Sequence, residues 1–370
     1  MKRFLYLLLL AFASVESWAQ MTWHNPMACG YEVVQNQAFA GEIDGYNRLP
    51  ERAKGVVREP VWNLSQNSAG LAIYFYTNSP AIEVRYTTTS RSYAMPHMPS
   101  TGVSGVDMYR VNSAGALDFC FGGYSFGEQV VYKYNDLADV SAEQGFEYRL
   151  YLPLYNGVKQ LEIGVHEGAE FKFIPASEEK PILIYGTSIA QGGCASRPSM
   201  AWGSILQRSL DVPVVNLGFS GNGRLEGEVI DFINEVDACL YILDCIPNLT
   251  SHKDVEERVI NAVKQIRSQH DEPILLIEHP GYSNEATNVE RRDMISSSNA
   301  ASRKAYEKLV KEGVKDLHYI SKADLECPPE TMVDYTHLTD LGMKQQAKVV
   351  ESKVRKILKM PVGRRNRETR

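Results

Sequence analysis

The sequence lacks the features that mark several common classes of protein. It has no basic excess, because 39 Lys and Arg residues stand against 45 Asp and Glu residues for a formal net charge of −6. It therefore shows no electrostatic footprint for nucleic acid. Beyond the N-terminus it has no apolar run long enough to span a bilayer. With a hydrophobic content of 44%, these absences favour a globular protein without stable membrane insertion.

Cysteine is also scarce. Six cysteines in 370 residues are too few for a disulfide scaffold, and their spacing does not suggest a metal site. Cys194 and Cys245 each follow a predicted strand, so a disulfide between them in an oxidising compartment is an open alternative that the sequence does not favour.

A third absence concerns catalysis. The serine-hydrolase elbow Gly-x-Ser-x-Gly does not occur in its usual form at the most suggestive serine. In PILIYGTSIAQGG, residues 181–193, an apolar run stops at Gly186 and the polar pair Thr187 and Ser188 follows. This is how a strand ends when it presents a hydroxyl at the edge of a sheet.

The first 19 residues have the composition of a secretory signal peptide. Lys2 and Arg3 precede the apolar run from Phe4 to Ala13, and the small residues Ser17 and Ala19 offer a cleavage site. We therefore expect cleavage after Ala19 and export to the periplasm or the extracellular space.

Residues 20–176 are predicted to form an antiparallel, jelly-roll-like β-sandwich. Apolar and polar residues alternate in stretches such as LAIYFYTNSPAIEVRYTTTS, and turns rich in Asn, Ser and Gly separate them. Asn156-Gly157 predicts a hairpin between two further strands. No helical periodicity of useful length appears in this half.

The period changes after the polar segment PASEEK, residues 175–180, which predicts a domain boundary. Strands that alternate with helices predict a five-stranded parallel sheet covered on both faces. We assign residues 177–358 to this α/β domain and residues 359–370 to a basic C-terminal tail. The apolar runs that predict the strands are 181–186, 212–217, 238–243, 273–278 and 317–321.

Residue types suited to acyl transfer follow these strands, where chemistry gathers in such sheets. Ser188 follows the first strand, and a serine nucleophile needs a base such as histidine. Among the histidines, His337 has a carboxylate three residues ahead, Asp334, which can orient its ring. Gly221 and Asn248, after the second and third strands, are candidate oxyanion donors together with the backbone N–H of Ser188.

The order Ser, Gly, Asn and Asp-x-x-His resembles the SGNH/GDSL hydrolase superfamily. The matching blocks are IYGTSIAQGG, NLGFSGNG, DCIPNLT and DYTHLTDLG. The resemblance implies a flavodoxin-like α/β/α fold with Ser188 as nucleophile, His337 as base and Asp334 as its partner. It implies an oxyanion hole made by Ser188, Gly221 and Asn248, and no metal or organic cofactor.

The β half adds to this resemblance. SGVDMYR is similar to the Gly-x-Asp-Leu-Tyr motif of a β domain that precedes the hydrolase in a two-domain, carbohydrate esterase-like branch. Asp107 and Tyr109 match this motif, and we interpret them as turn and packing residues. The chain departs from the family at Thr187, which replaces the Asp of Gly-Asp-Ser. It also departs in the third block, which lacks the usual Gly-x-Asn-Asp because Asn248 follows Cys-Ile-Pro and precedes Leu249.

Each candidate also has a structural interpretation. Ser188 could be a turn or helix-cap residue, and Asp334 could belong to a capping cluster before the last helix. The glycines of NLGFSGNG could form turns or a phosphate-binding loop, although they lack Gly-x-Gly-x-x-Gly spacing. Arg197, Trp202 and His279 are candidate substrate-binding residues, and the respective alternatives are a surface ion pair, helix core and a structural role.

Together these observations predict an exported serine esterase that forms an acyl-enzyme on Ser188. O-acetyl esters of a polysaccharide or glycan are the substrate class that the resemblance implies. A lipid or aryl esterase, or a thioesterase with the same triad, is one alternative. The other is a glycan-binding protein whose hydrolase domain is inactive.

Overall fold

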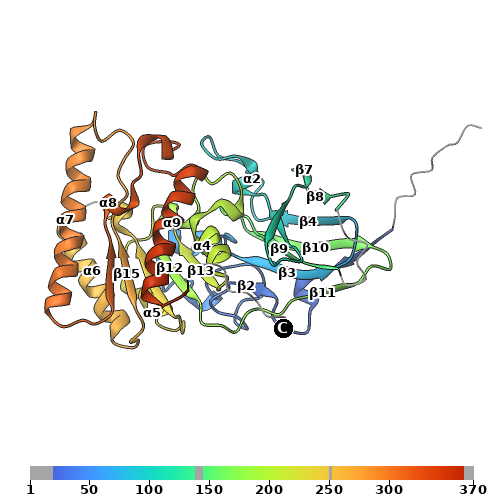
Figure 1. Cartoon of the computed structure of the whole chain (residues 1–370), viewed down its shortest axis with the longest axis horizontal. Coiled ribbons are helices and arrows are strands. Elements are labelled where there is room, and N and C mark those ends of the chain that lie inside the picture. The colour runs from blue at the N-terminus through green and yellow to red at the C-terminus, as the bar shows by residue number, and fades with distance from the viewer. Residues whose placement is uncertain (1–19, 138–144, 250–251, 362–370) are drawn as a thin grey trace, which may run out of the picture.

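A computed structural model of the chain describes residues 20–137, 145–249 and 252–361. The predicted signal peptide and the end of the basic tail lie outside these residues. Figure 1 shows a β-sandwich formed by the first half of the chain beside an α/β/α layer formed by the second, which confirms the predicted fold class. No helix of the described ranges combines the length and apolar character needed to cross a membrane.

Two antiparallel sheets form the sandwich. One has the strand order β1-β10-β4-β8-β7, and the other has β11-β3-β9-β5-β6 with β2 paired to β3. Alternate side chains of both sheets enclose an apolar core that includes Ile73, Val84 and Leu150. The strands are β1 (Met21–His24), β2 (Val34–Gln35), β3 (Ala72–Thr77), β4 (Ile82–Thr88), β5 (Asp107–Val111), β6 (Leu117–Cys120), β7 (Gly123–Ser125), β8 (Val130–Tyr134), β9 (Phe146–Tyr151), β10 (Val158–His166) and β11 (Phe171–Phe173).

The hairpin predicted at Asn156-Gly157 is wrong, because β9 and β10 on either side of it lie in different sheets. The Asn156 amide donates to the carbonyl oxygen of Ser90 at 2.8 Å, and the Gly157 N–H donates to Thr89 Oγ1 at 3.1 Å. A Cβ on Gly157 would lie 2.5 Å from the carbonyl oxygen of Gln66. The dipeptide thus allows a close approach between chain segments as the chain crosses from one sheet to the other.

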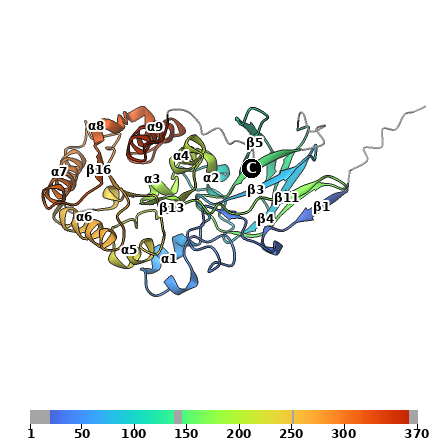
Figure 2. The same cartoon turned by 60° about the horizontal axis from the view of Figure 1, so that its bottom comes forward.

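The first half also contains helices that its sequence pattern did not predict. They are α1 (Glu59–Ser65) and α2 (Ser100–Val103), with 3-10 turns at Pro26–Ala28 and Glu51–Ala53. Each is at most two turns long, so apolar periodicity could not reveal it. Figure 2 shows α1 beside α5 (Gly227–Ile233) of the α/β layer. Residues 39–61 contribute to the same apolar cluster as the parallel sheet.

The second half contains a parallel sheet of order β13-β12-β14-β15-β16. This order is flavodoxin-like, with the first strand of the domain between the second and the third. Both ends of each of the five strands lie within two residues of the ends of the predicted apolar run. They are β12 (Ile182–Gly186), β13 (Val214–Gly218), β14 (Leu240–Asp244), β15 (Ile274–Ile277) and β16 (Leu317–Ile320).

Helices cover both faces of this sheet. The pair α4 and α9 packs on one face, whereas α5, α6 and α7 pack on the other, an arrangement that Figure 2 shows. The helices are α3 (Ser188–Gln191), α4 (Trp202–Leu210), α5 (Gly227–Ile233), α6 (His252–Arg267), α7 (Val289–Lys311), α8 (Lys322–Leu325) and α9 (Asp340–Ile357), with 3-10 turns at Pro198–Met200, Ile246–Asn248 and Pro329–Thr331.

A buried arginine joins the two halves. Arg48 donates to the carbonyl oxygens of Asn216 (3.1 Å) and Gly218 (2.6 Å) in β13, and to those of Leu64 (2.6 Å) and Asn67 (2.8 Å) in the first half. Burial lowers the pKa of its guanidinium to about 9. The end of β13, which leads into the predicted oxyanion loop, is therefore held by a residue of the first half.

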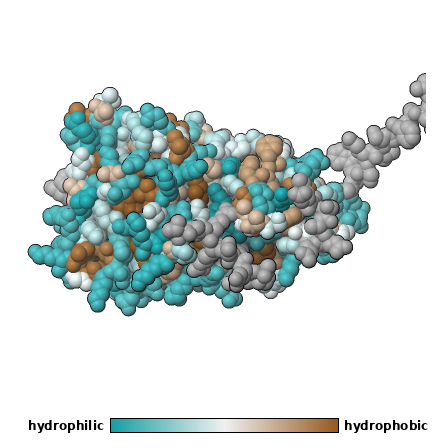
Figure 3. Space-filling view, in the orientation of Figure 1, coloured by the Kyte–Doolittle hydropathy of each residue, from teal (hydrophilic) through white to brown (hydrophobic). Residues whose placement is uncertain are grey.

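Some large apolar side chains are exposed on the surface of the protein. On the face seen in Figure 3, apolar residues form separate patches among hydrophilic ones. Large exposed apolar side chains include Phe121 and Tyr124 on the sandwich, and Val333, Tyr335 and Leu341 beside the His337 loop. Scattered exposed apolar residues are ordinary on soluble proteins, but the second group borders the predicted site.

Candidate active site

Ser188 is the first residue of the short helix α3, directly beyond β12, and its side chain is largely buried, with only 7% of the residue exposed. The Oγ1 of Thr187 accepts a hydrogen bond from the N–H of Ile189 at 3.3 Å and caps this helix. Thr187 thus does locally what an Asp can do at the same place. Because Ser188 is in the first turn, helix geometry gives its own N–H no partner.

Two glycines close the turn behind the serine. Gly192 ends α3 with a φ of +106°, a conformation that favours glycine. The N–H of Gly193 donates to the carbonyl oxygen of Ser188 at 2.7 Å. A Cβ on Gly193 would lie 2.9 Å from the Oη of Tyr155 and 3.1 Å from Cδ2 of His337. The space beside the nucleophile is therefore narrow.

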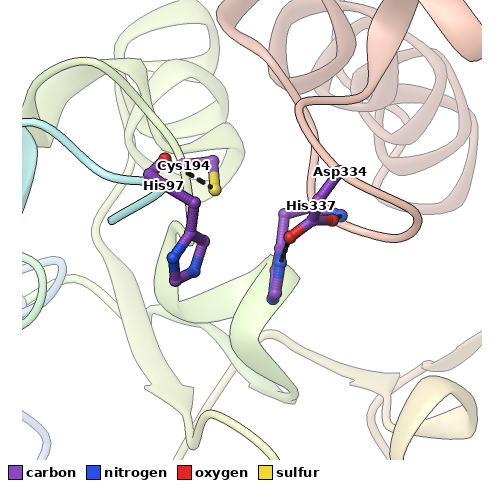
Figure 4. A group of neighbouring side chains, drawn as sticks. All are labelled: His97, Cys194, Asp334 and His337. Carbon is purple, nitrogen blue, oxygen red and sulfur yellow. Dashed lines mark hydrogen bonds and ion pairs between the residues drawn. The ribbon is translucent and has the colours of Figure 1, made fainter. Parts of the chain in front are cut away.

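The structure brings Ser188, His337 and Asp334 together in the order that acyl transfer requires. The Nε2 of His337 lies 2.9 Å from Ser188 Oγ, and its Nδ1 lies 2.8 Å from Asp334 Oδ2. Figure 4 shows the imidazole and the carboxylate side by side on one loop. With Nδ1 donating to the carboxylate, Nε2 is left free to accept the serine proton.

Asp334 is held as a carboxylate. Burial alone would raise its pKa, but hydrogen bonds from the His337 ring and from two backbone N–H groups outweigh burial and leave the pKa below its usual value. Those N–H groups belong to Thr336 and His337, each 2.8 Å from Oδ1. Both carboxylate oxygens are therefore engaged, and the charge faces the imidazole.

The loop after β13 lies against the nucleophile turn. The N–H of Phe219 donates to the carbonyl oxygen of Gly186 at 2.9 Å, and the N–H of Ser220 donates to Gln191 Oε1 at 2.9 Å. A Cβ on Gly223 would overlap the carbonyl oxygen of Gly186 and lie 3.1 Å from the N of Thr187. Gly223 is required by this approach.

Gly221 and Asn248 project from the two loops that flank this turn. Gly221 has a φ of +69°, and its N–H makes no hydrogen bond to any described residue. The Oδ1 of Asn248 accepts from the N–H of Gly223 at 3.1 Å, which leaves the amide Nδ2 as the free donor. The structure thus places the three predicted oxyanion donors around the end of β12.

The candidate substrate-binding residues do not join this group. Arg197 contacts Asp107 of the sandwich through Nη1 and lies 3.2 Å from the Oη of Tyr109. Trp202 is completely buried within the helix core, so it cannot present a ring to a sugar. His279 is also buried, and burial together with the nearby charge of Lys322 lowers its pKa to about 3. For Trp202 and His279, the structural alternatives hold.

The Gly-x-Asp-Met-Tyr motif forms the junction between the two halves. The buried carboxylate of Asp107 accepts from the N–H of Ser199 at 3.0 Å and also contacts the Oγ of Ser199 and Nη1 of Arg197. Tyr109 is a packing residue, as interpreted, because its ring packs against Tyr151. Asp107 is not a turn residue: it begins β5 and binds the loop between α3 and α4. That loop includes Cys194, whose thiol is near Asp334 and His337 of the triad.

His97 of the sandwich half is a neighbour of the triad that sequence reasoning missed. Its ring centroid lies 5.6 Å from that of His337. Cys194, buried and with a φ of +68°, donates from Sγ to the carbonyl oxygen of His97 at 3.5 Å. Burial, aided by the charge of Asp334, raises the pKa of this thiol to about 12, so it is not a competing nucleophile near neutral pH.

Cys194 and Cys245 both carry free thiols. Cys245 donates to the carbonyl oxygen of Tyr185 at 3.5 Å, whereas Cys194 faces the sandwich half. The disulfide that the sequence left open is therefore not formed.

A second buried carboxyl lies at the end of β14. Asp244 is fully buried, and its Oδ2 accepts from Nε2 of Gln346 at 3.2 Å. Burial raises its pKa to about 7, although the bond from Gln346 opposes this shift. Asp244 is paired with Gly186 in the register of the sheet, so a carboxyl with a raised pKa lies beneath the nucleophile turn.

Comparisons with known proteins agree with this geometry. Residues 179–355 match the model of the GDSL-like lipase/acylhydrolase family, and residues 21–171 match that of the GxDLY domain, the N-terminus of SGNH-hydrolase-type esterases. The crystal structure of a putative GDSL-like lipase from Bacteroides ovatus ATCC 8483 has 33% identity and a TM-score of 0.84, and the match covers 92% of this chain and 98% of that one. The chain belongs to the GDSL-like lipase/acylhydrolase family.

Another solved structure shares the fold of this GDSL-like acylhydrolase at lower identity. The salicylyl-acyltransferase SsfX3 from a tetracycline biosynthetic pathway has 18% identity and a TM-score of 0.72, and the match covers 92% of this chain and 99% of that one. The search of curated proteins gives no match. Membership of this family supports an acylhydrolase activity for the chain.

Proposed function

We propose that this GDSL-like acylhydrolase is an exported serine esterase that removes O-acetyl groups from a carbohydrate. The observation that carries the esterase assignment is the contact of Ser188 Oγ with His337 Nε2 at 2.9 Å, with Asp334 at 2.8 Å on the other ring nitrogen. A complete hydrogen-bonded triad of Ser188, His337 and Asp334 argues against a glycan-binding protein with an inactive hydrolase domain.

The reaction proceeds through an acyl-enzyme. Ser188 Oγ attacks the ester carbonyl carbon while His337 Nε2 accepts the hydroxyl proton. The negative charge on the carbonyl oxygen is stabilised by the N–H groups of Ser188 and Gly221 and by the amide of Asn248. His337 then protonates the departing alcohol oxygen, and the same base activates water to release the acid and regenerate Ser188.

The space around the nucleophile supports a small acyl group. Ser188 is largely buried, and even one methyl group added at Gly193 would crowd Tyr155 and His337. An acetyl group adds only a methyl beyond the carbonyl carbon. A long acyl chain would need a channel through these side chains.

The other side of the site supports a large alcohol with rings. His97 and Tyr335 are both exposed beside His337, and Tyr335 packs edge-on against Tyr282 at 5.2 Å between centroids. Aromatic rings with polar edges suit the apolar faces and hydroxyls of a sugar. The alcohol half of the substrate is therefore proposed to lie between the two halves of the chain.

A lipid or aryl esterase is the second candidate, and one observation favours it. Val333 and Tyr335 are both exposed on the loop that carries Asp334 and His337, which gives this loop an apolar surface. An apolar surface could hold a longer or aromatic acyl group outside the narrow space near Ser188.

The two candidates are separated by a series of p-nitrophenyl esters of increasing acyl length, assayed beside an acetylated polysaccharide for released acid. Acetyl specificity predicts that kcat/KM is highest for the acetate ester and that acetate is released from the polysaccharide. Ser188→Ala should lose both activities with an unchanged circular dichroism spectrum. Higher kcat/KM for octanoyl than for acetyl esters would reject the carbohydrate proposal, and wild-type turnover by Ser188→Ala would reject the nucleophile.

Export is proposed from the basic and apolar segment at the N-terminus, which lies outside the described residues. The mature chain should be recovered outside the cytoplasm with Gln20 as its first residue. Mass spectrometry of the N-terminal peptide from the exported fraction measures this, and recovery of the peptide that begins at Met1 in the cytoplasm alone would contradict it.

A further inference from the structure

Four potential metal ligands from three segments of the chain meet beside the catalytic histidine. One ring nitrogen of each histidine, the thiol sulfur and a carboxylate oxygen all lie within 4.8 Å of one another. Figure 4 shows the imidazoles of His97 and His337 alongside each other, with Cys194 beside His97 and the Asp334 carboxylate beside His337. The residues are His97, Cys194, Asp334 and His337.

We propose that this cluster is an inhibitory binding site for a thiophilic divalent transition metal, of which zinc is the best-suited example. Imidazole nitrogen and thiolate sulfur are the preferred ligands of zinc in proteins. The inference concerns regulation of the site, and it rests on the proposed esterase function only for its activity readout.

The spacing suits a tetrahedral ion after a small adjustment. Zinc bonds of about 2.0 Å to nitrogen and about 2.3 Å to sulfur place ligand atoms roughly 3.3–3.8 Å apart. The four ligand atoms now lie within 4.8 Å of one another, so binding requires them to move closer by on the order of 1 Å. His97 can make this movement because its side chain is exposed, and the loop between β4 and α2 that carries it has no strand partner beyond the bridge of Met95 to Met98.

Binding is incompatible with catalysis for a geometric reason. Both nitrogens of His337 are in use, with Nε2 on Ser188 and Nδ1 on Asp334. Coordination through Nε2 removes the base from the nucleophile, and coordination through Nδ1 removes its orienting carboxylate. The Cys194 thiol releases its proton to become a ligand, while the two imidazoles contribute lone pairs without any change of oxidation state.

The site also spans the junction between the halves. His97 belongs to the loop before α2, Cys194 follows α3, and Asp334 and His337 lie on the loop before α9. A bound ion therefore links the sandwich half to both loops of the catalytic domain. An ester that must enter between His97 and His337 would find its path closed.

The test uses the full exported chain freed of metal by a chelator. Co²⁺ is added as a spectroscopic probe and Zn²⁺ as a competitor. We expect one equivalent of Co²⁺ to produce a thiolate-to-cobalt charge-transfer band that Zn²⁺ abolishes. In parallel, Zn²⁺ should inhibit hydrolysis of the acetate ester, and the chelator should restore it.

Two variants assign the site, and two controls match them. His97→Ala and Cys194→Ser should each weaken Zn²⁺ inhibition at least about tenfold relative to the activity of the same metal-free variant, and Cys194→Ser should also lose the charge-transfer band. His166→Ala, in the sandwich, and Cys327→Ser, a half-buried thiol, should behave like the wild type.

Several outcomes would overturn the proposal. They are a wild type without the charge-transfer band, a Cys194→Ser variant that keeps it, or Zn²⁺ inhibition of equal strength in the wild type and in both variants. A wild type that hydrolyses no ester when metal-free, but that shows the band once Co²⁺ is added, would reject the esterase function and leave the metal site standing. The spectroscopic and kinetic measurements therefore fail independently.

Discussion

The buried carboxyl of Asp244 should make the stability of this protein decrease as the pH rises. In the folded state burial raises its pKa from 3.8 to about 7, whereas in the unfolded state water restores the ordinary value. Between these two values the folded protein holds a proton that the unfolded chain has released. The contribution of Asp244 to the free energy of unfolding therefore falls as the pH increases from about 4 to about 7, and the decrease ends above the folded pKa.

The magnitude follows from the two pKa values. The full difference corresponds to about 4 kcal/mol, of which about 3 kcal/mol is lost between pH 4.5 and 8. The variant Asp244→Asn replaces the carboxyl with a neutral amide of nearly the same shape, which can still accept from Gln346. The free energy of unfolding of Asp244→Asn should therefore lack the decrease of about 3 kcal/mol that Asp244 contributes between pH 4.5 and 8.

The assay is urea unfolding of the wild type and of Asp244→Asn at half-unit steps from pH 4.5 to 8. Subtracting the two curves removes the contributions of all other ionisable groups. Asp293→Asn, which removes an exposed carboxylate, is the control and should leave the wild-type curve within about 0.5 kcal/mol. A wild-type minus Asp244→Asn difference that stays constant to within 1 kcal/mol over this range would refute a neutral buried acid.

Three further predictions concern the site and its supports. Asp334→Asn should lower kcat on the acetate ester by roughly 10³ to 10⁴-fold with an unchanged circular dichroism spectrum, because an amide cannot hold His337 in the required tautomer; a loss of less than tenfold would exclude the orienting role. Gly223→Ala should lower both the Tm and kcat because its Cβ overlaps Gly186, whereas Gly123→Ala, which meets nothing within 4 Å, should change neither, and equal behaviour of the two would contradict the close approach. Asp107→Ala should cost about 2–4 kcal/mol in urea unfolding, since it strands a half-buried arginine, and a cost no larger than that of the more exposed Asp118→Ala would deny the junction role.

Much of the catalytic arrangement could be predicted because it follows from strand order. Parallel strands that are buried on both faces appear as apolar runs, and their carboxyl ends must meet at one edge. Ser188, Asn248 and His337 could therefore be placed near one another from sequence position alone, although they are up to 149 residues apart. Thr187, which departs from the family motif, became intelligible only when its side chain was seen to cap α3.

Other contacts could not be predicted because nothing local encodes them. His97 lies in an exposed loop with no regular pattern, and its neighbour His337 is 240 residues further along. Arg48 and Asp107 are charged residues, a type that is usually exposed on the surface. Only the packing of the two halves reveals that both are buried. Asn156-Gly157 was misassigned for the related reason that a strong turn preference says where the chain bends and not which sheet receives the next strand.

Arg48 has a consequence for how the molecule unfolds. Its guanidinium is completely enclosed by four carbonyl oxygens, two before the PASEEK segment and two after it. Separating the halves would leave that charge and those carbonyls without partners, and residues 39–61 would leave the apolar cluster of the parallel sheet. The two halves on either side of the PASEEK segment should therefore not unfold independently. Heat or denaturant should unfold the sandwich and the hydrolase domain in one cooperative transition.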